Sequence, residues 1–251
     1  MMMKTAIVTG ASRGIGAATA RAFARAGYAV VLAARNVTEL ESIAGEILSA
    51  GGRALAVPTD VTDPASVESL VKRAVAEFGA LDVAFNNAGG GAPPKPLAEI
   101  DPAAFESALR VNLFGTFLCM RSQIRAMKER GAGSIVNMSS TAGLQGVSGL
   151  GPYCAGKHAI IGLTKAAALD YASDQIRINV VAPGPIGTDR FNEEQRARIA
   201  RFVPAQRVGT PNDVAELVLW LSSSASNFIT GAVIPIDGGR MAGTPSFAVS
   251  P

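Results

Sequence analysis

Several residue types on which other folds and sites depend are scarce in this chain of 251 residues. It contains two cysteines, one histidine and one tryptophan. Two cysteines cannot form the disulfide framework of a small secreted protein, so we expect Cys119 and Cys154 to be free thiols. One histidine and two scattered cysteines also provide too few soft ligands for a zinc site. We therefore expect no metal centre.

Charge and long apolar runs are scarce as well. Asp, Glu, Lys and Arg make up 17% of the chain, and the formal net charge is +3. The basic residues are scattered, so we expect no nucleic-acid partner. No apolar run approaches the roughly 18 residues of a membrane-spanning helix, and the run after Lys4 is too short for a signal peptide. These absences favour a cytoplasmic protein without a membrane partner.

The chain does have a regular alternation of short apolar segments and helical patterns. The segments that read as strands are 5–9, 28–33, 53–57, 81–85, 134–138, 176–182 and 232–236, and the helical patterns span 15–26, 38–50, 64–78, 101–129, 153–172 and 211–222. The strands are apolar on both faces, as parallel strands covered by helices are. We predict an α/β fold, a doubly wound (Rossmann) parallel seven-stranded sheet with helices on both faces, in a single domain over residues 1–251. Ligands of such sheets bind beyond the carboxyl ends of the strands.

A glycine-rich turn follows the first predicted strand. Thr9 is followed by Gly10, and Gly14 and Gly16 come where a helix begins. Glycines let the backbone approach a pyrophosphate, and the free amides of a helix N-terminus bind the anion. The spacing G-x-x-x-G-x-G differs from the general dinucleotide fingerprint. The turn therefore indicates a nucleotide site, and a glycine-rich turn without a ligand is the alternative.

The residue at the end of the second strand indicates which nucleotide. An acid that would bind a free ribose 2′-hydroxyl is missing there, and Arg35 occupies the position. Arg13 lies inside the glycine-rich turn. Two guanidinium groups suit a 2′-phosphate, so we predict NADP(H) over NAD(H). If Arg35 only points into solvent, this preference loses its basis.

A serine, a tyrosine and a lysine follow the fifth strand. Tyr153 and Lys157 are four residues apart, so they share one face of a helix. A lysine ammonium near a phenol favours the phenolate and lowers its pKa toward the range useful for acid–base catalysis. Ser139 and Ser140 both end the strand, and alternation sends them to opposite faces. The offset of thirteen residues from Tyr153 favours Ser140 as the catalytic hydroxyl.

Taken together, these motifs resemble the short-chain dehydrogenase/reductase family, over Lys4 to about Met241. The resemblance depends on TGASRGIG at 9–16, Asp60-Val61, Asn86-Asn87-Ala88-Gly89, Asn112, Ser140, Tyr153 with Lys157, Pro183-Gly184 and Ile236-Asp237-Gly238-Gly239. Each motif is common, whereas all of them in this order are specific.

The resemblance implies four catalytic residues. Tyr153 would exchange a proton with the carbonyl or alcohol oxygen, and Ser140 would hydrogen-bond the same oxygen. Lys157 would lower the Tyr153 pKa and bind the nicotinamide ribose, while Asn112 would hold a water in a proton relay. The implied cofactor-binding residues are Gly10, Ser12, Arg13, Gly14, Ile15, Gly16, Arg35, Asp60, Val61, Asn87, Ala88, Gly89, Tyr153, Lys157, Pro183, Gly184, Ile186 and Thr188.

The resemblance also suggests a substrate lid at about 185–205, with a helix over 189–204, and a homo-tetramer, with a dimer as the alternative. The helix 153–172 supports an oligomer because it is apolar on more than one face. The pocket is expected from 90–97, 141–151 and 185–204. Its apolar residues, which include Leu144, Val147, Leu150, Pro185, Ile186 and Phe191, favour a small or medium ketone or its alcohol.

The predicted activity is hydride transfer between NADP(H) and a ketone or secondary alcohol. Two enzymatic alternatives stay open, an NAD-dependent secondary-alcohol, sugar or steroid dehydrogenase and a 3-oxoacyl thioester reductase. A non-catalytic nucleotide sensor and a halohydrin dehalogenase-type lyase are disfavoured by Tyr153, Lys157 and the glycine-rich turn. Fold alone does not decide the substrate.

Overall fold

The computed structural model describes residues 3–91, 93–188 and 191–243. Seven parallel strands form one sheet in the order β3-β2-β1-β4-β5-β6-β7. The strands are β1 (Thr5–Thr9), β2 (Ala29–Ala34), β3 (Arg53–Pro58), β4 (Val83–Asn86), β5 (Gly133–Met138), β6 (Ile176–Pro183) and β7 (Val233–Ile236). The predicted doubly wound parallel sheet is confirmed, with strand ends shifted by one or two residues, the usual uncertainty at element boundaries.

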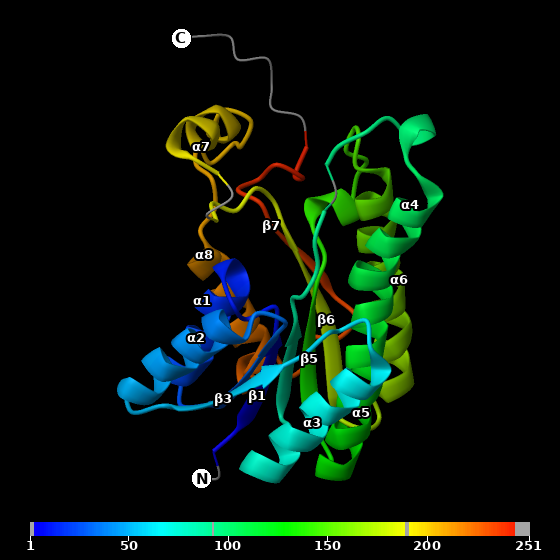
Figure 1. Ribbon diagram of the computed structural model, residues 1–251. Helices are drawn as coiled ribbons and strands as arrows, with labels where there is room; N and C mark the ends of the chain where they lie inside the picture. Colours follow the sequence, from blue (N-terminus) through cyan, green and yellow to red (C-terminus); the bar gives the residue numbers. More distant parts are fainter. Residues whose placement is uncertain (1–2, 92, 189–190, 244–251) are drawn as a thin grey trace.

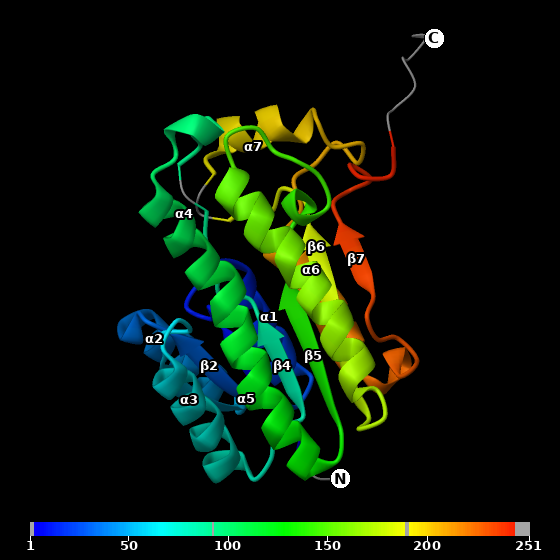
Figure 2. The same ribbon diagram turned by 90° about the vertical axis from the view of Figure 1, so that its right-hand side faces the viewer.

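Helices cover both faces of the sheet (Figures 1 and 2). One face carries α1 (Gly14–Arg25), α2 (Val37–Ser49) and α8 (Pro211–Ser222), and the other carries α3 (Pro64–Phe78), α5 (Gly115–Arg130) and α6 (Gly151–Tyr171). Each face has its own apolar core, the first around Phe23 and Phe85, the second around Leu70 and Met127. The sheet is therefore buried on both sides, which explains why its strands lack a polar face.

Two helices begin at an aspartate followed by proline. Asp63 accepts hydrogen bonds from the amides of Ala65 and Ser66, at 3.1 and 3.2 Å. Asp101 caps α4 (Pro102–Leu109) in the same way, through the amide of Ala103 at 2.8 Å. These side chains bond amides that have no partner within the helix. Proline, which has no amide hydrogen, needs no such partner at the first helical position.

The predicted helix 101–129 is wrong in one respect, because its middle is not α-helical. A π-helical segment, η2 (Arg110–Phe114), separates α4 from α5. Asn112 Nδ2 donates to the Ala108 carbonyl at 2.9 Å, and the Thr116 hydroxyl donates to the Asn112 carbonyl at 2.7 Å. Side-chain donors thus form hydrogen bonds with main-chain carbonyl oxygens where the helix widens. Such π-segments occur frequently at functional sites.

The predicted helix 189–204 is also shorter in the structure. Residues 189–190 lie outside the described residues, and α7 spans Glu193–Ala200. Asn192 starts it with a capping box, in which Asn192 and Gln195 each bond the other's backbone amide at 2.8 and 3.0 Å. Across the described residues, no helix combines the length and apolar character that crossing a membrane requires.

Candidate active site

A cleft of about 1010 Å³ lies along the carboxyl ends of the strands. It is lined by most of the predicted site residues: Gly10, Ser12, Arg13, Gly14, Ile15, Arg35, Asp60, Val61, Asn87, Ala88, Gly89, Ser140, Tyr153, Lys157, Pro183, Gly184, Ile186 and Thr188. Two predicted residues, Gly16 and Asn112, are not among those that line it. The structure thus brings together residues from β1 to the segment after β6, at the edge where open α/β sheets bind ligands.

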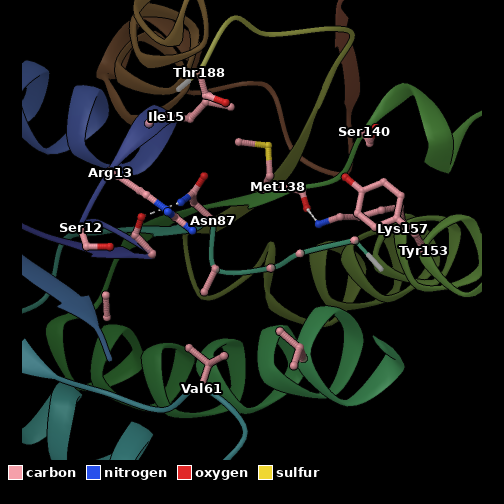
Figure 3. A pocket seen from close by; sticks show the side chains of 18 of the residues that line it. Ser12, Arg13, Ile15, Val61, Asn87, Met138, Ser140, Tyr153, Lys157 and Thr188 are labelled. Carbon is pink, nitrogen blue, oxygen red and sulfur yellow. Dashed lines mark hydrogen bonds between the residues drawn. The ribbon is translucent and has the colours of Figure 1, made fainter. Parts of the chain in front are cut away.

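The glycine-rich turn forms one end of this cleft (Figure 3). Gly10 and Gly14 have φ angles of +66° and +56°, which L-residues with a Cβ rarely adopt. A Cβ on Gly16 would overlap the carbonyl oxygen of Gly10. Arg13 precedes α1 without making a side-chain cap. The turn therefore packs tightly, and Arg13, the residue that precedes α1, provides no side-chain cap for the first amides of the helix.

Asn87, which directly follows β4, supports this turn. Its Nδ2 donates to the carbonyls of Thr9 and Gly10, at 3.0 and 3.1 Å. Its backbone amide donates to Thr9 Oγ1 at 3.0 Å, and so does the amide of Ala88 at 3.1 Å. Both amide hydrogens of the Asn87 side chain are used in this way, so its first task is to hold the turn.

Arg35 and Asp60 lie farther along the same end of the cleft. Arg35 is exposed, so its guanidinium is accessible from the cleft. Asp60 Oδ1 accepts from the amide and the hydroxyl of Thr62, at 2.9 and 2.8 Å. These bonds, with a smaller contribution from the charges of Arg35 and Arg110, lower the pKa of Asp60. Asp60 is therefore ionised at neutral pH.

At the other end, α6 brings Tyr153 and Lys157 next to Ser140 (Figure 3). The Lys157 side chain is buried, and its Nζ donates to the Met138 carbonyl at 2.9 Å. The same Nζ lies 5.6 Å from the centre of the Tyr153 ring. Burial lowers the pKa of Lys157 to about 8. The amine is thus still mostly protonated at pH 7, close to a phenol that lines the cleft.

The two serines after β5 have different surroundings. Both line the cleft, and the Ser140 Oγ accepts a hydrogen bond from the Ala142 amide at 3.1 Å. Ser139 is 2% exposed, and its Oγ donates to the main-chain carbonyl of Lys157 at 2.9 Å. An accepting hydroxyl keeps its hydrogen for a second partner. Ser140 can therefore donate toward the cleft, whereas the hydroxyl of Ser139 is committed to α6.

Asn112 lies behind the wall of the cleft, fully buried in η2. Besides Ala108, its Nδ2 donates to the Gly90 carbonyl at 2.8 Å, and its Oδ1 accepts from the Gly90 amide at 3.3 Å. A Cβ on Gly89 would come within 2.7 Å of Asn112 Oδ1 and 3.3 Å of Lys157 Nζ. Asn112 therefore holds the loop after β4 close to the lysine.

The substrate end is only partly as predicted. Leu150, Pro185, Ile186 and Phe191 line the cleft, whereas the expected Leu144 and Val147 are not among its lining residues. Lining residues that the sequence reasoning missed include Met138, Arg110, Val111 and Glu39. Position next to a motif could have indicated Met138, but no motif marks the other three.

The chain is similar to known proteins over nearly its whole length. A family model described as "Enoyl-(Acyl carrier protein) reductase" matches residues 10–240. The chain is 43% identical over 243 residues to cis-4-hydroxycyclohexanecarboxylate dehydrogenase of Sinomonas cyclohexanicum, covering 95% of this chain and 97% of that protein. It is 39% identical over 235 residues to cyclohexanol dehydrogenase of Acinetobacter sp. (strain SE19), covering 94% of each.

A solved structure is similar to this chain in fold. The short-chain type dehydrogenase/reductase from Mycobacterium marinum superposes with a TM-score of 0.91 at 35% identity, over 96% of this chain and 97% of that one. The chain belongs to the short-chain dehydrogenase/reductase family. The resemblance drawn from the motifs is confirmed, and the chain is an oxidoreductase of this family, which uses nicotinamide cofactors.

Proposed function

We propose that this protein transfers a hydride between NADP(H) and a ketone or secondary alcohol, with Tyr153 as the general acid or base. The observation that carries this proposal is the arrangement of the cleft. Ser140, Tyr153 and Lys157 meet at one end, and the glycine-rich turn with Arg13 and Arg35 forms the other. A dinucleotide bound along the cleft would extend from the turn to the tyrosine.

The residues present fit such a cofactor. Gly10 and Gly16 let the backbone approach a pyrophosphate, and the first amides of α1 are available to its charge. Asp60 and Val61 line the cleft and would contact the adenine, and Lys157 would bind the nicotinamide ribose. Pro183, Gly184, Ile186 and Thr188 line the nicotinamide side. When bound, the cofactor supplies or accepts the hydride.

The chain's own residues handle the proton and the developing charge. In the reductive direction, the Tyr153 hydroxyl gives its proton to the carbonyl oxygen, and Ser140 donates a hydrogen bond to the same oxygen. Two donors aimed at that oxygen stabilise its negative charge as it forms. The Lys157 ammonium makes Tyr153 a stronger acid by stabilising the phenolate. Asn112 holds the loop beside Lys157, where a water would relay the proton onward.

The preference for NADP(H) depends on Arg13 and Arg35. Both line the cleft, and both are exposed where a 2′-phosphate would lie. One observation favours the alternative cofactor, since Glu39 in α2 lines the same part of the cleft. A carboxylate suits the 2′-hydroxyl of NAD(H). An NAD-dependent secondary-alcohol dehydrogenase is therefore the second candidate.

For the substrate we propose an alicyclic secondary alcohol or ketone. The lining contributed by Leu150, Pro185, Ile186 and Phe191 is apolar and suits a hydrocarbon ring. The names of two relatives, cyclohexanol dehydrogenase and cis-4-hydroxycyclohexanecarboxylate dehydrogenase, describe six-membered rings with a secondary alcohol. A 3-oxoacyl thioester stays the alternative substrate.

Three further features belong to this proposal. The chain would act as a single cytoplasmic domain whose segment 185–205 is the substrate lid. It would form a homo-tetramer, because exposed apolar side chains such as Leu169 (83%) and Phe228 (105%) have no cover within the described chain. In the tetramer that we propose, these large apolar side chains would be covered between subunits.

The test is oxidation of NADPH and of NADH, measured separately against cyclohexanone, a linear ketone and an acetoacetyl thioester. We expect NADPH with cyclohexanone to give the highest kcat/KM. In the variant Arg35→Ala, the KM for NADPH should rise about tenfold or more while that for NADH stays unchanged, because a charged hydrogen-bonded partner of the phosphate is lost. Preference for NADH in the wild type would contradict the phosphate site, and preference for the thioester would contradict the alicyclic substrate.

A further inference from the structure

Ser140 and Tyr153 reach the cleft from different elements. Ser140 follows β5, and Tyr153 lies in the first turn of α6. Their separation therefore depends on how α6 is docked against β5. Because catalytic groups must be held to within a fraction of an ångström, the contacts that dock the helix influence the reaction.

Besides the bond from Lys157 Nζ to the Met138 carbonyl, two further side-chain hydrogen bonds connect the end of β5 to α6. Ser139 Oγ donates to the main-chain carbonyl of Lys157 at 2.9 Å, and Asn137 Nδ2 donates to Thr164 Oγ1 at 2.9 Å. All four residues are buried, with Asn137 and Thr164 fully inaccessible. Lys157 and Thr164 are seven residues apart, so the two bonds hold the same face of the helix two turns apart. They fix its position and its rotation.

The first of these bonds acts on Lys157 itself. Met138 accepts from Lys157 Nζ at 2.9 Å, and Ser139, the next residue, holds the Lys157 main chain. The turn at Thr141–Gly143 covers these contacts of Met138 and Ser139 with Lys157. A Cβ on Gly143 would overlap Ser139 Oγ and lie 2.7 Å from the Lys157 carbonyl oxygen. The bond from Ser139 therefore lies in a tightly packed place, where its loss would not be replaced by water.

We propose that Ser139 is a positioning residue for the reaction, because its hydroxyl holds Lys157 and the first turns of α6 at the distance from Ser140 that proton transfer requires. The inference rests on the proposed function, in which Tyr153, Lys157 and Ser140 act on one oxygen. Ser139 does not touch the reacting atoms, since its hydroxyl is committed to the Lys157 carbonyl.

The variant Ser139→Ala tests this role, with Ser134→Ala as its matched control. Ser134 lies on β5 itself, is buried like Ser139, and also donates to a helix carbonyl, that of Leu221 in α8 at 3.1 Å. It lies at the opposite end of the strand from the cleft. We expect Ser139→Ala to lower kcat about 10- to 100-fold while the KM for NADPH stays within about twofold. Ser134→Ala should lose stability but keep kcat.

A second measurement reports on geometry without turnover. Tyrosine ionisation is followed by absorbance from neutral to alkaline pH in the unliganded protein, and the curve of Tyr153→Phe is subtracted to isolate Tyr153. In Ser139→Ala the Tyr153 midpoint should move to higher pH, because the lysine is held less firmly beside the phenol. A purely structural serine would leave the midpoint unchanged. If Ser139→Ala does not fold, Thr164→Val removes the second hydrogen bond between β5 and α6, and the same two measurements are made on it.

The outcomes separate this inference from the proposed function. If Tyr153→Phe keeps its turnover, the proposed function itself is wrong. If Tyr153→Phe is inactive but Ser139→Ala matches Ser134→Ala in kcat and leaves the tyrosine midpoint in place, only the positioning role is overturned. A loss of kcat with a shifted midpoint, absent from Ser134→Ala, supports it.

Discussion

At the scale of single residues, Lys157 has a proposed catalytic role, and its burial lowers the stability of the folded protein at neutral pH. Its side chain is 3% exposed, and burial lowers the pKa of the amine to about 8 from 10.5. Between these two values the unfolded chain binds more protons than the folded one, so stability rises as the pH rises through this window. Below pH 8 the folded protein bears the full cost of the buried ammonium, about 3 kcal/mol.

Replacing Lys157 by methionine should therefore stabilise the protein at neutral pH while abolishing turnover. The lost bond to Met138 offsets about 1 kcal/mol, which leaves a gain of about 2 kcal/mol in the free energy of unfolding at pH 7. Most of the gain should disappear by about pH 9.5. Urea unfolding at both pH values measures it, with Lys165→Met, an exposed lysine on the same helix, as the control. A difference that does not change with pH would contradict this explanation.

At the scale of elements, the start of α1 shows why glycine is needed at one place in a helix and not at another. A Cβ on Gly16 would overlap the carbonyl oxygen of Gly10, so the turn would have to move. Gly45 is also inside a helix, α2, and a Cβ there would meet nothing within 4 Å. The two positions form a matched pair that separates packing from helix propensity.

Gly16→Ala should destabilise the protein by about 1–3 kcal/mol and weaken NADPH binding, because the turn that we propose to bind the phosphates is displaced. Gly45→Ala should raise stability by up to about 1 kcal/mol, since alanine favours the helix, and leave binding unchanged. Urea unfolding and titration of NADPH fluorescence measure both effects. Equal NADPH affinity in the two variants would show that the turn tolerates the change.

The elements themselves could be predicted from the sequence because the signals are local. Apolar runs mark the buried strands, and Asp63 and Asp101 mark two helix starts. The π-segment η2 could not be predicted, since Asn112 bonds there to Gly90, twenty-two residues away in the sequence. Contacts of this kind depend on the folded arrangement rather than on periodicity.

At the scale of the whole molecule, strand order creates the cleft. The chain leaves β1 toward β2 and β3 on one side and returns to β4 on the other, so the glycine-rich turn and the loop after β4 face each other. Spacing and the family resemblance indicated which residues gather there. The supporting contacts of Asn87 and Ser139 were missed, because a buried hydroxyl or amide has no sequence signature apart from its fold.

The exposed apolar side chains lead to a prediction for the assembled protein. Light scattering should give a mass near four times 25.7 kDa, since Leu169 and Phe228, 83% and 105% exposed, are the side chains that the proposed interface would cover. Leu169→Asp should reduce that mass, because a charge would be buried in the interface. Leu48→Asp, at a leucine of α2 that is 53% exposed, is the control and should not change it. A wild-type mass of 25.7 kDa would contradict the tetramer.

The most direct test of the account is the turnover of Tyr153→Phe, with the affinity for NADPH measured on the same preparation. Removing one hydroxyl leaves the ring and the cleft in place, so the dissociation constant for NADPH should stay within about twofold. The kcat should fall by about 100- to 10,000-fold, the usual contribution of a general acid or base. A kcat within about tenfold of the wild type would contradict the central claim that Tyr153 moves the proton.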